Sequence, residues 1–166
     1  LGWQRQNERA AGKGRTVQEE IEKAIAVMHG HPVPLIGSGR TDSGVHAAGQ
    51  VANFHTDIAR IPAERFVPAL NSLLARDIRI LDSREVSRDF HARFDARART
   101  YRFFIYCGKH PLAHEMPYIW HLGRWPDVAK LNRMASALQG EIDCSTFTAS
   151  GDQSHTRSRY LYGAHF

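Results

Sequence analysis

A loop with four glycines joins two short apolar runs in the first third of the sequence. It contains Gly39-Arg40-Thr41-Asp42-Ser43-Gly44-Val45-His46 and leads directly into an alternating run over residues 48–54. Glycines at positions 37, 39, 44 and 49 permit positive φ and the close approach of another molecule. The loop therefore predicts an accessible, firmly oriented Asp42 with Arg40 two residues before it, as suits a reactive carboxylate.

The residues alone leave two interpretations of Asp42 open. Asp is common in turns because its side chain bonds to nearby backbone groups, so Arg40 and Asp42 could simply form an ion pair that stabilises the turn. Alternatively, Asp42 is catalytic. No second carboxylate and no Ser-His or Cys-His pair accompanies it, which disfavours glycosidases and triad hydrolases. A solitary Asp favours nucleophilic attack, or base catalysis aided by a cation. His46 either orients Asp42 or is a simple loop histidine.

Several other function classes are disfavoured by missing motifs. Gly37, Gly39 and Gly44 do not have GxGxxG spacing, and no P-loop lysine follows them. The ten histidines include no HExxH motif and no metal-binding pair, so neither a metal nor another cofactor is expected. No apolar run is long enough for a membrane span. The two cysteines, Cys107 and Cys144, are expected to be buried thiols, which fits a reducing cytoplasm.

A second cluster combines arginines with aromatic residues over residues 88–103. Within a predicted strand at 97–107, one face carries Arg97, Arg99, Tyr101 and Phe103, because side chains alternate. Arginines bind phosphates and aromatic rings stack on unpaired bases, the combination used for single-stranded or looped RNA. The excess of 22 Lys and Arg over 17 Asp and Glu is compatible with a polyanionic partner. The other interpretation is an amphipathic strand whose aromatics face the core.

Hydrophobic periodicity and capping signals predict an α+β fold. A capping box at Thr16 begins a first helix that ends near Gly30, a second helix follows Pro62, and a third runs from Asp127 to Leu138. Strands are predicted at 48–55, 77–86, 97–107 and 157–166. This order indicates a mostly antiparallel sheet with helices packed on one face, and two similar half-units. We expect an N-terminal half at 1–107 and the start of a second half at 108–166.

Together these segments resemble the TruA-type tRNA pseudouridine synthases. The resemblance rests on motifs in the family's order: Gly2-Trp3-Gln4-Arg5-Gln6, Thr16-Val17-Gln18, Gly39-Arg40-Thr41-Asp42, Gly44-Val45-His46, Gly49-Gln50-Val51, Leu70-Asn71 with Asp77-Ile78, Phe90-His91-Ala92-Arg93-Phe94 and Tyr101-Arg102-Phe103. It implies the pseudouridine synthase fold with two RRM/ferredoxin-like halves. It covers the whole chain, but only about the first two-thirds of a typical family member.

The resemblance implies isomerisation of uridine to pseudouridine at tRNA positions 38–40, in the anticodon stem-loop. Asp42 would be the nucleophile, Tyr101 would pack against the target uracil, and Arg40 would hold the flipped nucleotide and pair with Asp42. Arg97, Arg99 and His46 complete the expected binding residues. The resemblance further implies a cytoplasmic homodimer that grips tRNA and needs no cofactor or metal.

Two departures from the family pattern accompany the resemblance. The loop from Asn7 to Arg15 is longer than in the shortest members and is expected to form a basic arm that contacts RNA or lacks order. The chain also stops before the family's C-terminal segment, so weak or no activity is expected from residues 1–166 alone. Two rival functions remain: an RNA-binding module without catalysis, and an Asp-nucleophile enzyme acting on a small phosphorylated or glycosidic substrate.

Overall fold

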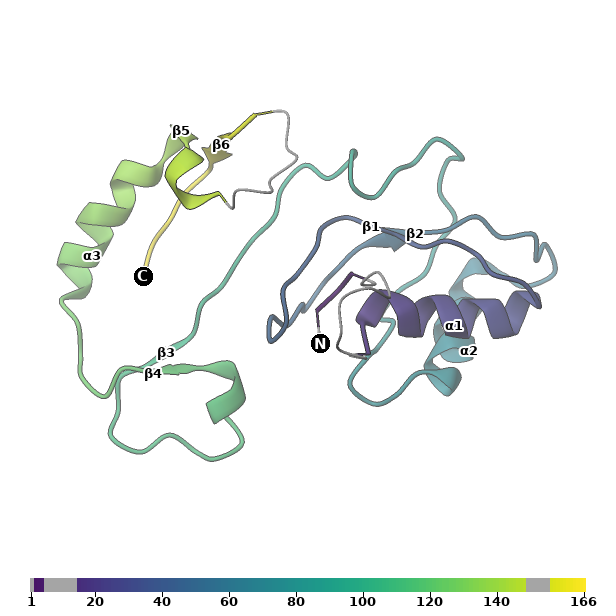
Figure 1. The fold of residues 1–166 in the computed structure, drawn as a ribbon, viewed down its shortest axis with the longest axis horizontal. Coiled ribbons are helices and arrows are strands. Elements are labelled where there is room, and N and C mark those ends of the chain that lie inside the picture. The colour runs from purple at the N-terminus through teal and green to yellow at the C-terminus, as the bar shows by residue number, and fades with distance from the viewer. Residues whose placement is uncertain (1, 5–14, 149–155) are drawn as a thin grey trace. The chain divides into compact units, whose positions relative to one another are not determined.

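The computed structural model of the chain describes residues 2–4, 15–148 and 156–166 (Figure 1). The chain divides into two compact units, Leu1–Arg99 and Thr100–Phe166, which are described separately. Helices alternate with three two-stranded sheets, of which β1–β2 and β5–β6 are antiparallel and β3–β4 is parallel. The predicted mixture of helices and strands is confirmed. Of the expected arm from Asn7 to Arg15, every residue except Arg15 lies outside the described residues.

Helix α1, Val17–His29, begins and ends at the residues that the capping signals indicate. The Thr16 hydroxyl accepts a hydrogen bond from the Glu19 N–H at 3.3 Å. Gly30 ends the helix with φ 75°, a left-handed conformation that glycine adopts without steric cost. The face carrying Ile21 and Ile25 is buried, so the predicted amphipathic helix is confirmed.

Surface ion pairs lie just beyond both ends of α1. Arg15 bonds to Asp77 and lies 3.4 Å from Glu20, and the Arg15 hydrogen bond holds the pKa of Asp77 below its usual value. At the other end His31 bonds to Asp57 at 3.0 Å, and this carboxylate raises the pKa of His31. Exposed pairs of this kind contribute little stability. The apolar core therefore provides most of the stabilisation of α1.

The core of the first unit lies between α1, the β1–β2 pair and α2. β1 is Ile36–Gly37 and β2 is Ala52–Asn53; a 3-10 helix at Ala63–Arg65 leads into α2, Phe66–Leu73. In Figure 1, α1 runs beneath the β1–β2 pair with α2 beside it. The buried side chains that form this core are Trp3, Ile21, Ala24, Ile25, Val33, Leu35, Phe66, Leu70, Leu74 and Ile78.

Pro68 is compatible with α2 because it lies in the first turn of the helix. Backbone N–H groups in that turn have no partner within the helix, so the missing proline N–H costs nothing there. The second predicted helix is therefore confirmed despite its internal proline.

The predicted strand at 77–86 is wrong. Within the described residues no strand pairs with this segment. Instead the Asn71 side chain takes the place of a neighbouring strand: its Oδ1 accepts from the Ile80 N–H and its Nδ2 donates to the Ile80 carbonyl, each at 2.9 Å. An alternating pattern indicates a segment with one face buried. A strand also needs an adjacent strand to which its backbone N–H and C=O groups can bond. The predicted strand at 48–55 shortens to Ala52–Asn53 for the same reason.

The second unit contains short elements with little burial. Its strands and helices are β3 (Ile105–Tyr106), a 3-10 helix at Met116–Tyr118, β4 (Trp120–His121), α3 (Val128–Ala135), a 3-10 helix at Ser136–Leu138, β5 (Gly140–Asp143), a 3-10 helix at Ser145–Phe147 and β6 (Ser158–Leu161). Asp127 caps α3 as predicted, by accepting from the Lys130 N–H at 2.8 Å. Among the described residues from 100 onwards, only Ala135 is buried.

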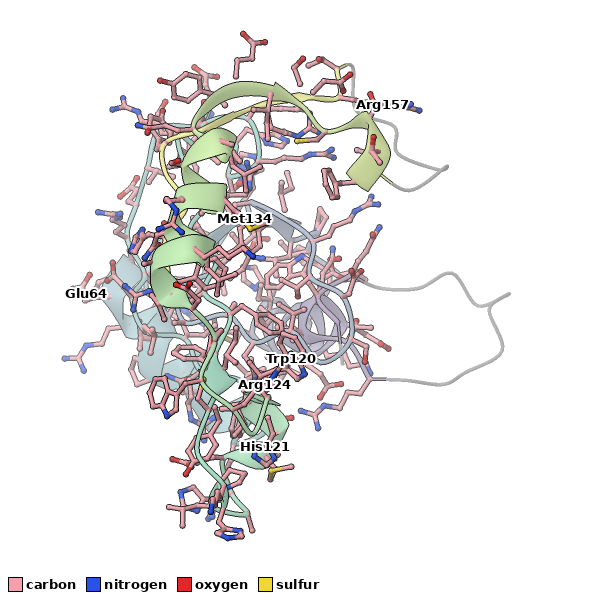
Figure 2. All side chains as sticks on the ribbon, turned by 90° about the vertical axis from the view of Figure 1, so that its left-hand side faces the viewer. Glu64, Trp120, His121, Arg124, Met134 and Arg157 are labelled. Carbon is pink, nitrogen blue, oxygen red and sulfur yellow. The ribbon has the colours of Figure 1, made fainter. Side chains whose placement is uncertain are left out.

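The predicted strand at 97–107 is confirmed only at Ile105–Tyr106. Its neighbour is β4, whose Trp120 N–H donates to the Phe104 carbonyl at 2.8 Å. Figure 2 labels Trp120 and His121 on this short strand, with Arg124 just after them. Because residues 97–103 are not strand, the predicted shared face of Arg97, Arg99 and Tyr101 loses its basis. β6 likewise covers only part of the predicted strand at 157–166.

Gly37 provides a test of the packing beneath β1. A Cβ built on Gly37 would lie 2.5 Å from the Trp3 indole ring, which is buried. We expect Gly37→Ala to destabilise the protein by about 1–3 kcal/mol, as overpacking a core does. The measurement is the urea midpoint at constant slope. Gly49→Ala is the control, because a Cβ there has nothing within 4 Å. Equal midpoints for the two variants would contradict this packing.

Candidate functional site

The Asp42 loop, residues 38–51, connects β1 to β2. Its ends lie side by side because Gly37 pairs with Ala52, and the Ser38 N–H donates to the Val51 carbonyl at 2.8 Å. Asp42 lies at an exposed turn closed by a hydrogen bond of 3.2 Å from the Val45 N–H to the Asp42 carbonyl. Gly44, the third residue of this turn, has φ 86°, a conformation that favours glycine.

The Gly2–Trp3 segment lies against the backbone of this turn. The Trp3 N–H donates to the Thr41 carbonyl at 3.0 Å. A Cβ built on Gly2 would lie 2.8 Å from that same Thr41 oxygen and 3.3 Å from the Asp42 carbonyl carbon, so only glycine fits without movement. On its other side the segment accepts hydrogen bonds from the first turn of α1: Val17 N–H to Gly2 at 3.2 Å and Gln18 N–H to Trp3 at 3.0 Å. The helix thus fixes the segment, and the segment fixes the turn.

The Asp42 carboxylate is exposed, and within the part of the chain that the structure describes no hydrogen bond or ion pair occupies it. Arg40 is also exposed, and the two side chains form no ion pair within 4.0 Å here. An ion pair that merely stabilises the turn is therefore not what holds this loop. The backbone bonds of Trp3 and Val45 hold it instead. Such an Asp has both oxygens available for another molecule.

The other predicted site residues lie in different surroundings. Arg99 donates through Nη2 to the Ser38 carbonyl at 2.5 Å, so its guanidinium lies at the start of the Asp42 loop. Arg97 and His46 are exposed in the same unit. Tyr101 is 77% exposed and belongs to the second unit. The structure thus brings Arg99 to the loop, while Tyr101 is part of a separate compact unit.

A turn at residues 90–95 is anchored to the strand that follows the Asp42 loop, which the sequence analysis missed. Asn53 of β2 accepts a hydrogen bond from the Ala92 N–H at 2.9 Å, and Ala92 is buried. The His91 ring stacks on Phe94 with centroids 4.2 Å apart. Arg93 is exposed on this turn. The only sequence signal was a polar Asn53 inside an apolar alternating run.

Two kinds of feature are absent from the described residues. No group of three or more His, Cys, Asp or Glu side chains is arranged to hold a metal ion. In the same residues no helix combines the length and the apolar character that crossing a membrane requires.

Comparison with known proteins identifies similar sequences over nearly the whole chain. Residues 2–95, which include the Asp42 loop and the turn at 90–95, match the model of the tRNA pseudouridine synthase family. A tRNA pseudouridine synthase A of Treponema denticola is 56% identical over 165 residues, or 99% of this chain and 62% of that protein.

Proteins of the same name from more distant bacteria are also similar. The Caldicellulosiruptor saccharolyticus protein is 42% identical over 98% of this chain and 64% of its own length. The Bacillus subtilis protein is 43% identical over 89% of this chain and 60% of its own length. The chain therefore spans about three-fifths of the length of the curated relatives it matches.

The contact between Gly2 and the Asp42 turn generates a prediction. Gly2→Ala introduces a Cβ that the Thr41 carbonyl cannot accommodate, so we expect the Trp3–Thr41 hydrogen bond to weaken. Amide hydrogen exchange should then accelerate at Trp3 by about tenfold, which corresponds to ~1.4 kcal/mol of lost protection. Gly49→Ala, in the same loop but without a clash, is the control. Unchanged Trp3 exchange in Gly2→Ala would show that the segment does not hold the turn.

Proposed function

The chain belongs to the tRNA pseudouridine synthase family, and from that membership we propose that the protein isomerises uridine to pseudouridine in tRNA, with Asp42 as the nucleophile. The observation that carries the proposal is the Asp42 turn. Its carboxylate is exposed, while its backbone is bonded to Trp3 and Val45. A reactive group needs this combination, because orientation in advance of binding lowers the barrier to reaction.

The proposed reaction conserves atoms and electrons. The bond between uracil N1 and ribose C1′ breaks, the uracil rotates, and a bond forms between C5 and C1′. The proton on C5 is lost and N1 gains one, so the isomerisation is neutral in redox terms. Asp42 forms a covalent intermediate, either at the ribose C1′ or at the uracil C6. Both routes use the same exposed carboxylate.

The proposed substrate is the anticodon stem-loop, at positions 38–40. A base within a stem has to be flipped out, at a cost of a few kcal/mol. Tyr101 then stacks on the uracil, Arg40 holds the flipped nucleotide beside Asp42, and His46 and Arg97 contact the surrounding RNA. All four side chains are exposed. Arginine contacts to phosphates offset the cost of flipping and make binding dependent on salt.

The proposal extends to the fold of the two halves and to the assembly of the subunits. Each unit forms part of one RRM/ferredoxin-like half. The protein works in the cytoplasm as a homodimer, and tRNA binds across both subunits. Stacking of Tyr101 on the target uracil is the proposed contribution of the second unit.

Release of label from C5 tests the reaction. With tRNA carrying tritium at uridine C5, the full-length protein should release tritium as the new bond to C5 forms. We expect Asp42→Ala to reduce this release by at least about 10⁴-fold, because no other described carboxylate lies on the turn, while the Kd for tRNA changes less than about threefold. Asp89→Ala, outside the loop, is the control and should retain release.

The two rival functions predict different results in the same assay. If the protein is an RNA-binding module without catalysis, neither the wild type nor Asp42→Ala releases tritium, and both still bind tRNA. An enzyme acting on a small substrate turns over without RNA, and tRNA does not compete. Loss of tRNA affinity as large as the loss of rate in Asp42→Ala would contradict the assignment of a nucleophile.

The arginine cluster predicts a salt dependence. Arg93, Arg97 and Arg102 are exposed, and each phosphate contact contributes about 0.7–0.9 to the slope of log K against log salt. The triple Gln variant should therefore flatten the slope for tRNA binding by about 2. Lys23→Gln is the control, because Lys23 already pairs with Glu19 and Glu20 on α1. An unchanged slope in the triple variant would place these arginines away from the RNA.

A further inference from the structure

The two ends of the Asp42 loop are joined by the side chain of Gln50. Its Nε2 donates to the Gly39 carbonyl at 2.8 Å, and its Oε1 accepts from the Ser38 hydroxyl at 2.5 Å. A carbonyl oxygen can only accept, so the Gly39 contact fixes which end of the amide is the nitrogen. One half-buried side chain thus bonds both residues that precede Arg40-Thr41-Asp42.

Two other groups also hold together the two ends of the loop, residues 38–39 and 50–51, which we call its neck. The Ser38 backbone N–H donates to the Val51 carbonyl at 2.8 Å. The Arg99 guanidinium donates to the Ser38 carbonyl at 2.5 Å, and its Nε would lie 3.4 Å from a Cβ built on Gly39. Every polar group of Ser38 is therefore engaged, although residues 42–49 beyond the neck are exposed.

We propose that Gln50 is a positioning residue, which joins residues 38–39 to the strand side of the loop and so holds Asp42 in its reactive orientation. Its hydrogen-bond partners are Ser38 and Gly39, and Arg99 supports them by its bond to the Ser38 carbonyl. The inference rests on the proposed function. Gln50 does not touch substrate; it acts through the backbone that carries Asp42. The Trp3 N–H fixes the Thr41 carbonyl and the Gln50 amide fixes the Gly39 carbonyl, so only Arg40 lies between these two fixed points and Asp42 follows the second directly.

A second glutamine in the same unit provides a matched comparison. The Gln18 amide donates to the Glu22 carboxylate and to the Leu35 carbonyl, each at 3.1 Å. It therefore makes hydrogen bonds of similar kind that link α1 to the residues before β1. We expect loss of the Gln18 amide to lower stability while the Gln18 backbone N–H keeps its bond to Trp3, so that the Asp42 loop stays in place. Gln50→Leu and Gln18→Leu thus separate positioning from general support of the fold.

The experiment measures kcat, KM and tRNA Kd of the full-length protein, with far-UV circular dichroism to confirm folding. Gln50→Leu should lower kcat about 10- to 100-fold, because small misplacements of a reacting group have effects of this size. Kd for tRNA should stay within about twofold. Ser38→Ala removes one of the two bonds and should lower kcat by a smaller factor. Gln18→Leu should leave kcat within about twofold.

Gln50→Glu adds a second measurement, the pH dependence of kcat, which a merely structural role of Gln50 would leave unchanged. Its ionised carboxylate would face the Gly39 carbonyl with no proton to donate, whereas the protonated acid restores the missing donor. The ratio of its kcat to that of the wild type should therefore rise as the pH falls towards the pKa of glutamate, about 4.3 in the absence of perturbation.

The outcomes separate the two claims. A wild-type protein without tritium release contradicts the proposed function itself. An active wild type with kcat unchanged in Gln50→Leu, or lowered no more than in Gln18→Leu, overturns the positioning role and leaves the function intact. If Gln50→Leu does not fold, the test rests on Ser38→Ala and Gln50→Glu. The positioning role is overturned if Ser38→Ala has the kcat of the wild type and if the kcat of Gln50→Glu relative to the wild type does not change with pH.

Discussion

The hydrogen bonds of the two-residue segment Gly2–Trp3 are the constraint on which the first unit depends. They join the first turn of α1 to the carbonyl of Thr41, with Trp3 buried over Gly37. A helix capped at Thr16 and packed through Ile25 is a rigid support. Through Trp3 that rigidity reaches a turn which itself has almost no buried side chains. An exposed carboxylate can thus be held in place without being buried.

This arrangement resolves a conflict between exposure and precision. The nucleophile proposed for this protein has to be accessible to a nucleotide in a large RNA, yet burial is the usual source of rigidity. Here the side chains of residues 42–49 remain exposed, while the backbone of the Asp42 loop is bonded at several points, by Trp3, Val45, Gln50 and Arg99. Each bond contributes only about 1 kcal/mol net. Their number, not their individual strength, restricts the loop.

The sequence predicted those features that depend on local chemistry. The cap at Thr16, the cap at Asp127 and the glycine loop around Asp42 all have short-range causes, and all are present in the structure. The failures concern pairing over distance. Residues 77–86 carry a strand-like pattern, but Asn71 bonds Ile80 instead. Residues 97–103 have no neighbouring strand among the described residues, so the alternating pattern alone wrongly put Arg97 and Arg99 on a shared strand face. The hydrogen bonds of Trp3 with Thr41 and of Asn53 with Ala92 join residues that lie too far apart in the sequence for residue spacing to predict them.

A positional map of pseudouridine tests most directly whether the Asp42 turn modifies tRNA. Unmodified tRNA is incubated with the full-length protein, and every uridine is then scored for conversion. The proposed role of the Asp42 turn predicts conversion at positions 38–40 of the anticodon stem-loop and at no other uridine. Tight binding of tRNA with no conversion at any position would contradict it, and would leave a module that recognises RNA without acting on it.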